Sequence, residues 1–118
     1  MRPRLAAVLA VTALAGTGAA VAGADTQAAR TYPADGATVS ERTSKATITF
    51  GQIVRSGTMT VRGPRGVVSR KARVSSRDRR KLYATLKRPL AEGRYRVTWR
   101  IKAVDGHTQR GSWSFRVR

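Results

Sequence analysis

The chain has 118 residues, with 24 Lys and Arg against 6 Asp and Glu, and its formal net charge is +18. This length allows one domain and excludes a multidomain enzyme. The absence of Cys excludes disulfides, zinc–thiolate sites, iron–sulfur clusters and thiol catalysis. A single His, His107, excludes a metal site built from several histidines of one chain. The hydrophobic fraction of 41% is typical of globular proteins, so a folded domain is expected.

The first 24 residues have the three parts of a secretory signal peptide. Arg2 and Arg4 precede an uncharged apolar run over residues 5–15, and the segment ends in Ala22-Gly23-Ala24, which has the A-x-A cleavage pattern. An uncleaved anchor helix is the alternative, because a bilayer span needs about 20 apolar residues. The second half of the segment is mostly Gly, Ala and Thr, which transfer weakly into hydrocarbon and therefore favour cleavage.

Cleavage after Ala24 would give an exported protein, periplasmic, extracellular or attached to the cell envelope. We therefore divide the chain into a signal peptide, residues 1–24, and one domain, residues 25–118. Removal of Arg2 and Arg4 lowers the formal charge from +18 to +16. Without disulfides, the exported domain depends on its hydrophobic core for stability.

Alternation of apolar and polar residues predicts strands along most of the mature chain. The clearest alternations cover residues 46–50, 82–86, 94–102 and 112–118, and weaker ones cover residues 57–62, 67–69 and 72–75. Gly, Pro and Asp separate these segments, as expected for turns. The stretch 75–81 has no apolar face and is expected to form a solvated loop. About seven short strands predict an all-β fold, an antiparallel Greek-key β-sandwich of immunoglobulin-like or cupredoxin-like form.

The segment from Leu90 to Tyr95 adds a more specific feature. Leu90, Gly93 and Tyr95 have the spacing of a tyrosine corner, in which the phenol hydroxyl bonds to backbone a few residues upstream. Ordinary core packing of Tyr95 is the alternative. Both interpretations belong to the same sandwich architecture.

Three segments in order along the chain resemble the copper-resistance protein C (CopC) family. They are Tyr32-Pro-Ala-Asp-Gly-Ala37, the strand Leu90–Trp99 (LAEGRYRVTW), and Ala103-Val-Asp-Gly-His107 followed by Gly111-Ser-Trp-Ser-Phe115. Together they span nearly the whole mature chain. The resemblance implies an exported Greek-key β-sandwich that binds Cu(II) and takes part in copper handling.

The family's Cu(II) site, carried onto this sequence, would consist of the mature N-terminal residue Asp25, Asp105 and His107. Residues i and i+2 of an extended segment project to the same side, so Asp105 and His107 can converge on one ion. Imidazole, amine and carboxylate ligands suit Cu(II). The simpler alternative is that His107 is a solvated turn residue and not a metal ligand.

This chain departs from the family at the mature N-terminus. Family members typically begin with His, whereas Asp25 would offer its α-amine, with an ordinary pKa of about 7.7–8.0, and a carboxylate. An oxygen in place of a ring nitrogen predicts weaker and less copper-selective binding. Met59 is the one methionine after the signal peptide, and one thioether cannot hold Cu(I), so no Cu(I) site is expected.

The basic residues form two groups. Arg94, Arg96, Arg100 and Lys102 should share the outer face of one strand, with Arg116 and Arg118 beside them, and a second cluster comprises Arg77, Arg79, Arg80 and Lys81. Such surfaces attract acidic lipid headgroups or phosphate-bearing wall polymers, although a solvated surface with no ligand is the simpler interpretation. Nucleic acid is an unexpected target, because no exposed aromatics are interleaved with the cations.

These features predict an exported Cu(II)-binding protein of copper homeostasis or resistance. Its expected partners are the copper ion, a copper-transport membrane protein and an anionic wall or lipid surface. The alternative is a basic β-sandwich that binds anionic envelope polymers and carries a degenerate metal site. We expect no enzymatic activity, because no nucleophile elbow, phosphate-binding loop or other catalytic constellation is present.

Overall fold

The computed structural model describes residues 28–118, and every regular element within them is a strand. In chain order the strands are β1 (Ala28–Tyr32), β2 (Thr38–Val39), β3 (Lys45–Phe50), β4 (Val54–Gly63), β5 (Gly66–Val67), β6 (Arg73–Val74), β7 (Lys81–Thr85), β8 (Gly93–Ala103) and β9 (Thr108–Val117). Within this part of the chain, no helix is long and apolar enough to cross a membrane. The signal peptide predicted for residues 1–24 lies outside the described residues.

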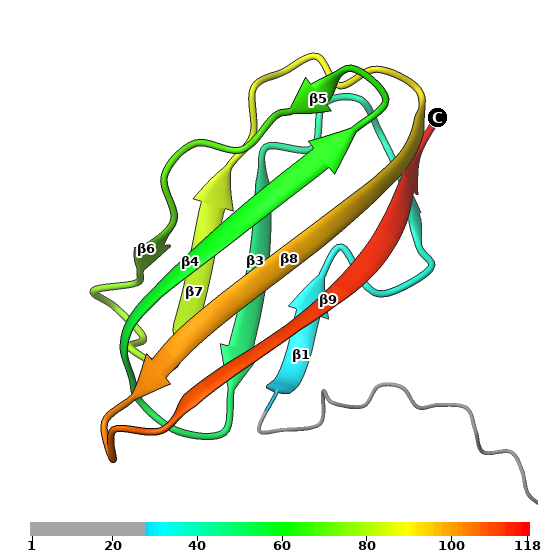
Figure 1. Cartoon of the computed structure of the whole chain (residues 1–118). Helices are drawn as coiled ribbons and strands as arrows, with labels where there is room; N and C mark the ends of the chain where they lie inside the picture. Colours follow the sequence, from blue (N-terminus) through cyan, green and yellow to red (C-terminus); the bar gives the residue numbers. More distant parts are fainter. Residues whose placement is uncertain (1–27) are drawn as a thin grey trace, which may run out of the picture.

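Two sheets pack face to face to form the sandwich (Figure 1). One sheet has the strand order β1-β3-β7-β6, and the other has the order β2-β9-β8-β4-β5. The long strands β4, β8 and β9 make up the middle of the second sheet and cross in front of the first sheet in Figure 1. This arrangement confirms the predicted Greek-key β-sandwich.

Strand β8 supplies much of the core because its side chains alternate strictly between the two faces of its sheet. Tyr95, Val97, Trp99 and Ile101 are buried, and the residues between them are exposed. The Trp99 ring meets Phe50 of the opposite sheet edge-on at a centroid distance of 5.1 Å, and the Tyr95 ring stacks on Phe115 at 5.3 Å. Burial of each such side chain contributes roughly 1.5–3 kcal/mol.

Tyr95 forms the predicted tyrosine corner. Its hydroxyl donates a hydrogen bond of 2.6 Å to the carbonyl oxygen of Ala91, four residues upstream, while its ring lies in the core. The ring packs so closely against Gly63 that a Cβ at that position would lie 2.2 Å from the Tyr95 Cε2 atom. The corner therefore ties the start of β8 to both the preceding loop and the end of β4.

Several predicted strand limits were wrong. Strands β1 and β2 were not predicted, and β2 pairs in parallel with β9, so the sandwich is not purely antiparallel. Strand β9 begins at Thr108 rather than residue 112, because Gln109 and Gly111 occupy its first inward positions and conceal the alternation. The segments 67–69 and 72–75 contribute only the short strands β5 and β6. The predicted loop over residues 75–81 is confirmed up to Arg80, after which β7 begins.

Replacing Tyr95 by Phe should lower the free energy of unfolding by about 1 kcal/mol, because the ring stays but the hydrogen bond to Ala91 is lost. Tyr83→Phe is a matched control: Tyr83 is half-buried on β7, and no hydrogen bond from its hydroxyl is found within residues 28–118. Urea denaturation measures both variants. Equal stability of Tyr95→Phe and wild type would show that packing alone accounts for the role of Tyr95.

Candidate metal site

The β8–β9 hairpin turns through Val104, Asp105 and Gly106 at one end of the sandwich. The Gly106 amide donates to the Ala103 carbonyl oxygen, and the Ala103 amide donates to the His107 carbonyl oxygen, each at 2.9 Å. Gly106 has a φ of +93°, in the left-handed region that a residue with a Cβ adopts only at a cost. Glycine at this position therefore lets Asp105 and His107 flank a tight turn.

The side chains of Asp105 and His107 contact each other directly. Asp105 Oδ1 accepts a 3.0 Å hydrogen bond from the His107 backbone amide, and Asp105 Oδ2 lies 3.0 Å from His107 Nδ1. When Nδ1 carries the proton and donates it to the carboxylate, Nε2 retains a free lone pair. The His107 side chain is 79% exposed and that of Asp105 is 50% exposed. The pair therefore presents an oriented imidazole nitrogen to solvent.

This contact shifts the pKa values of both groups. The hydrogen bond from the His107 side chain, together with that from its amide, lowers the pKa of the Asp105 carboxyl. The hydrogen bond to Asp105 and the charge of its carboxylate raise the pKa of His107 above the ordinary value of 6.5. A metal ion that binds His107 must therefore compete with a proton over a wider pH range than at an isolated histidine.

Other connections meet the hairpin at the same end of the sandwich. The Val104 amide donates to the carbonyl oxygen of Ile53, which lies in the β3–β4 connection. The first residue of β1, Ala28, is paired with Phe50, where that connection begins. Figure 1 shows the start of β1 and the β8–β9 hairpin at the lower end of the molecule. Strand β1 thus begins at the end of the sandwich that carries Asp105 and His107.

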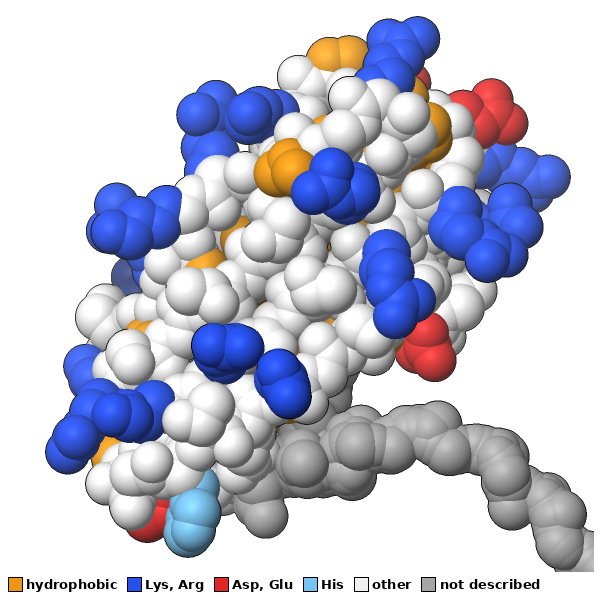
Figure 2. Space-filling model, in the orientation of Figure 1, with side chains coloured by type: hydrophobic (Ala, Val, Ile, Leu, Met, Phe, Trp, Pro, Cys, Tyr) orange, Lys and Arg blue, Asp and Glu red, His pale blue; other side chains and the backbone are white. Residues whose placement is uncertain are grey.

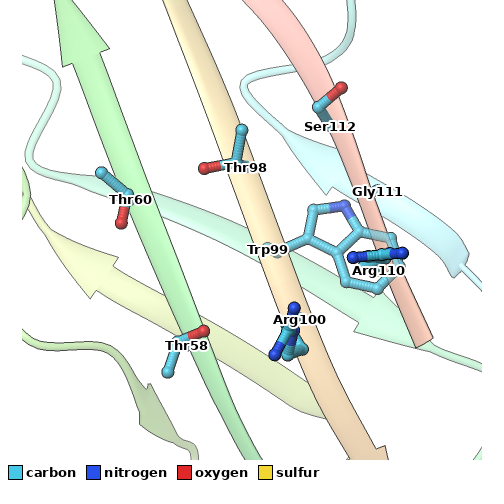
Figure 3. A pocket seen from close by; sticks show the side chains of 8 residues that line it. All are labelled: Thr58, Thr60, Thr98, Trp99, Arg100, Arg110, Gly111 and Ser112. Atoms are coloured by element: carbon cyan, nitrogen blue, oxygen red, sulfur yellow. The ribbon is translucent and has the colours of Figure 1, made fainter. Parts of the chain in front are cut away.

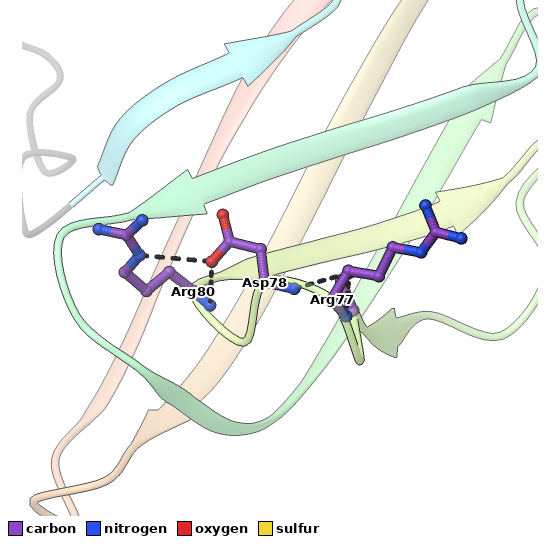
Figure 4. A network of polar contacts seen from close by, with 4 residues as sticks. Arg77, Asp78 and Arg80 are labelled. Atoms are coloured by element: carbon purple, nitrogen blue, oxygen red, sulfur yellow. Dashed lines mark hydrogen bonds and ion pairs between the residues drawn. The ribbon is translucent and has the colours of Figure 1, made fainter.

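The β6–β7 loop carries the second predicted basic cluster to this end. The carbonyl oxygens of Arg79 and Arg80 accept hydrogen bonds from Val54 and Phe50, each at 2.8 Å. The one carboxylate of the loop, Asp78, accepts hydrogen bonds from the backbone amide and the Nε of Arg80, at 3.1 and 3.3 Å (Figure 4). The backbone hydrogen bond is the main reason why the pKa of Asp78 is lowered. The Asp78 carboxylate thus forms its hydrogen bonds within the loop and stabilises it.

Of the three predicted metal ligands, the structure describes two. Asp105 and His107 lie side by side, whereas Asp25 lies outside the described residues. Met59 is buried in the core at 5% exposure. Within residues 28–118, no three His, Cys, Asp or Glu side chains gather closely enough to hold a metal ion. A metal at the hairpin therefore needs at least one further ligand besides Asp105 and His107.

The fold and the hairpin together define a class: a two-layer β-sandwich that presents an exposed Asp–His pair at one end. Residues 28–118 match the CopC domain, and the chain belongs to the CopC domain family. This family is the one that the three sequence segments resemble.

Individual relatives agree with this assignment. Protein YobA of Escherichia coli K12 is 30% identical over 91 residues, which cover 74% of this chain and 73% of YobA, and YobA of Shigella flexneri matches equally well. Among solved structures, CopC from Methylosinus trichosporium OB3b has a TM-score of 0.70 and 23% identity, covering 77% of this chain and 91% of its own. The methionine-rich copper resistance protein PcoC from Escherichia coli has a TM-score of 0.66 and 22% identity, with coverages of 78% and 97%.

Replacing Asp105 by Asn should lower the pKa of His107 toward 6.5, because the charged hydrogen-bond acceptor that stabilises the imidazolium is removed. A proton NMR titration can follow the change without assignment, since the chain has one His. Asp35→Asn is a control with the same loss of charge, because Asp35 is bound to the Ser114 amide, far along β9 from the hairpin. A His107 pKa unchanged by Asp105→Asn would show that the contact does not persist in solution.

Proposed function

We propose that this protein is an exported Cu(II)-binding protein of copper homeostasis or resistance. The observation that carries the proposal is the exposed Asp105–His107 pair, held at 3.0 Å on a hairpin of a CopC-family sandwich. The structural neighbour PcoC is described as a copper resistance protein, which supports the same class of function. The proposal gives the protein a binding role rather than a catalytic one.

The ligand set that we propose comprises His107, Asp105 and the residue that begins the mature chain, Asp25. Asp25 lies three residue steps before Ala28, and a fully extended chain spans at most about 10 Å over that distance. Since β1 begins at the same end of the sandwich as the hairpin, the proposal requires the α-amine of Asp25 to reach His107 across this end. This path depends on the proposed cleavage of the signal peptide after Ala24.

The donors favour Cu(II) over Cu(I). An imidazole nitrogen, an α-amine and carboxylate oxygens suit the tetragonal geometry of Cu(II), whereas Cu(I) prefers thiolates and thioethers. PcoC is described as methionine-rich, but here Met59 is buried and cannot serve as a surface ligand. Asp105 can either bind the ion directly or hold the His107 ring through Nδ1 while Nε2 binds.

Positive charge near the hairpin disfavours the approach of Cu²⁺. Cationic side chains from the β6–β7 loop lie at the same end and repel Cu²⁺, but salt screens exposed charges beyond about 8 Å at physiological ionic strength. The carboxylates of Asp105 and Asp25 would dominate at the coordination distance. A copper-transport membrane protein is the partner that we propose for delivery or acceptance of the ion.

The alternative function, a basic module for anionic polymers with a degenerate metal site, has separate support in the outer face of the β4–β8–β9 sheet. That face does not include the Asp105–His107 pair. The two candidate binding surfaces are therefore separate, so polymer binding at this face does not depend on whether the hairpin binds copper.

Titration of the processed protein with Cu(II) should give one bound ion, with nitrogen hyperfine coupling in the electron paramagnetic resonance spectrum. His107→Ala should lower the affinity at least about tenfold and remove the imidazole contribution, because it deletes a nitrogen ligand. Thr108→Ala, at the next exposed position of the hairpin, is the matched control and should bind as wild type does.

Mass spectrometry of the same sample fixes the N-terminus. A chain that begins at Asp25 should lose affinity when its α-amine is acetylated. The copper proposal is overturned if the wild type shows no nitrogen coupling or if His107→Ala leaves its spectrum unchanged.

Copper affinity should rise with pH. Cu(II) must displace the proton of His107, whose pKa is raised, and that of the α-amine, so binding weakens as the pH falls through these values. Competition with a chromophoric chelator from about pH 5 to 8 should show close to two protons released per ion at the acidic end. Acetylation of the α-amine should reduce this to about one. An affinity that is flat over this range would contradict nitrogen ligation.

A further inference from the structure

The outer face of the β4–β8–β9 sheet consists of cations and hydroxyl groups. Its exposed cations, which we call the basic strip, are Arg62 on β4, Arg94, Arg96, Arg100 and Lys102 on β8, and Arg110 and Arg116 on β9. The other outward positions of the paired segments are Ser or Thr. Figure 2 shows blue Lys and Arg side chains spread over a largely white surface, with red carboxylates toward its edges. No carboxylate of the described residues occupies an outward position of these paired strands.

Sheet pairing places several of these cations directly opposite one another. Arg62 pairs with Arg96, Arg100 with Arg110, and Arg94 with Arg116. Like charges at directly opposite positions destabilise a sheet. Nor is the repulsion relieved internally, since the ion pairs found within residues 28–118 involve only Arg80 with Asp78 and His107 with Asp105. An external anion between the opposed arginines would relieve it.

The hydroxyl groups lie between the arginine pairs and complete a shallow depression. Thr60, Thr98 and Ser112 form one row across the three strands, and the next row is Thr58, Arg100 and Arg110 (Figure 3). These residues line a hollow of about 480 Å³. Ser112 Oγ accepts a 2.9 Å hydrogen bond from Arg96 Nη2, so hydroxyls and guanidinium groups already interact on this surface. Both kinds of donor bind phosphate oxygens well.

The strip is long and narrow. The eight residue steps from Arg94 to Lys102 cover roughly 27 Å, and the spacing of the three strands adds a width of about 10 Å. A single small anion would use only a fraction of this surface, whereas an extended chain of anions would contact several arginine pairs at once. The observations therefore favour a linear polymer with repeating negative charges.

We propose that the basic strip binds a linear phosphate polymer through its backbone charges. Arginine outnumbers lysine on the strip, and the planar guanidinium group binds phosphate through two parallel hydrogen bonds. The exposed aromatic residue Tyr32 lies on the other sheet, so the strip has no platform for stacking nucleic acid bases. It has no apolar side chain for membrane insertion either, apart from Val67, which pairs with Arg62 at the edge.

The test compares two triple variants that lose the same charge. Arg96→Thr/Arg100→Thr/Arg110→Thr neutralises the middle of the strip with residues that suit strands. Arg70→Thr/Arg73→Thr/Lys87→Thr removes three exposed cations outside the strip. The probe is linear inorganic polyphosphate, titrated in copper-free buffer at about 0.15 M salt. Thermal unfolding confirms that both variants fold, and relief of like-charge pairs should leave the strip variant at least as stable as wild type.

The strip variant should bind polyphosphate at least about tenfold more weakly than wild type, and the control variant should change less than about twofold. The slope of log K against log[salt] should fall by about 2 to 3 in the strip variant, because each lost phosphate contact removes about 0.7–0.9. His107→Ala should bind polyphosphate as wild type does, so the result is independent of the copper proposal.

Three results would overturn the proposal. Equal weakening of both triple variants would show that binding reflects net charge rather than the strip. Tighter binding to a single-stranded thymidine oligonucleotide than to polyphosphate would assign the strip to nucleic acid. Binding to vesicles containing phosphatidylglycerol without saturable binding to polyphosphate would assign it to a membrane surface.

Discussion

The register of strand β8 against β4 and β9 determines which side chains lie on each face of the larger sheet. Because the side-chain period of a strand is two, a slip of one residue would expose Tyr95 and Trp99 and bury Arg94 and Arg96. Burial of unpaired arginines costs far more than the sheet hydrogen bonds could recover. The same pairing runs as far as Lys102 and Thr108, which bound the turn that carries Asp105 and His107. Core, basic strip and candidate metal site thus depend on one pairing.

The candidate metal site and the basic strip share the β8–β9 hairpin but differ in their electrostatics. At the turn, a carboxylate contacts the imidazole and sets the local charge. Along the strip, arginines face each other without an acid between them. A polyanion bound to the strip would neutralise part of the positive field around the sandwich, and so would reduce the repulsion that Cu²⁺ meets as it approaches the hairpin. The two proposed activities are therefore compatible on one small domain.

Prediction from sequence succeeded where one face of a strand is buried and the other is solvated. Strands β3, β7 and β8 show this alternation, and their predicted ranges lie close to the observed ones. It failed where small or polar residues occupy inward positions. Gly111 is an example: a Cβ there would lie 2.7 Å from the Trp99 ring, so the core at this point is filled from the neighbouring strand. The first half of β9 therefore contains no apolar residues whose alternation could predict a strand.

The sequence by itself determined the all-β class, the family resemblance and the proximity of Asp105 to His107. These features depend on local patterns, since alternation and an i, i+2 pair across glycine involve only neighbouring residues. Only the tertiary structure decided that β2 pairs in parallel with β9, that the start of β1 reaches the end carrying the hairpin, and that Arg62 lies opposite Arg96. Those contacts join segments far apart in the chain, and which segments pair is fixed by how the two sheets bury their apolar faces together.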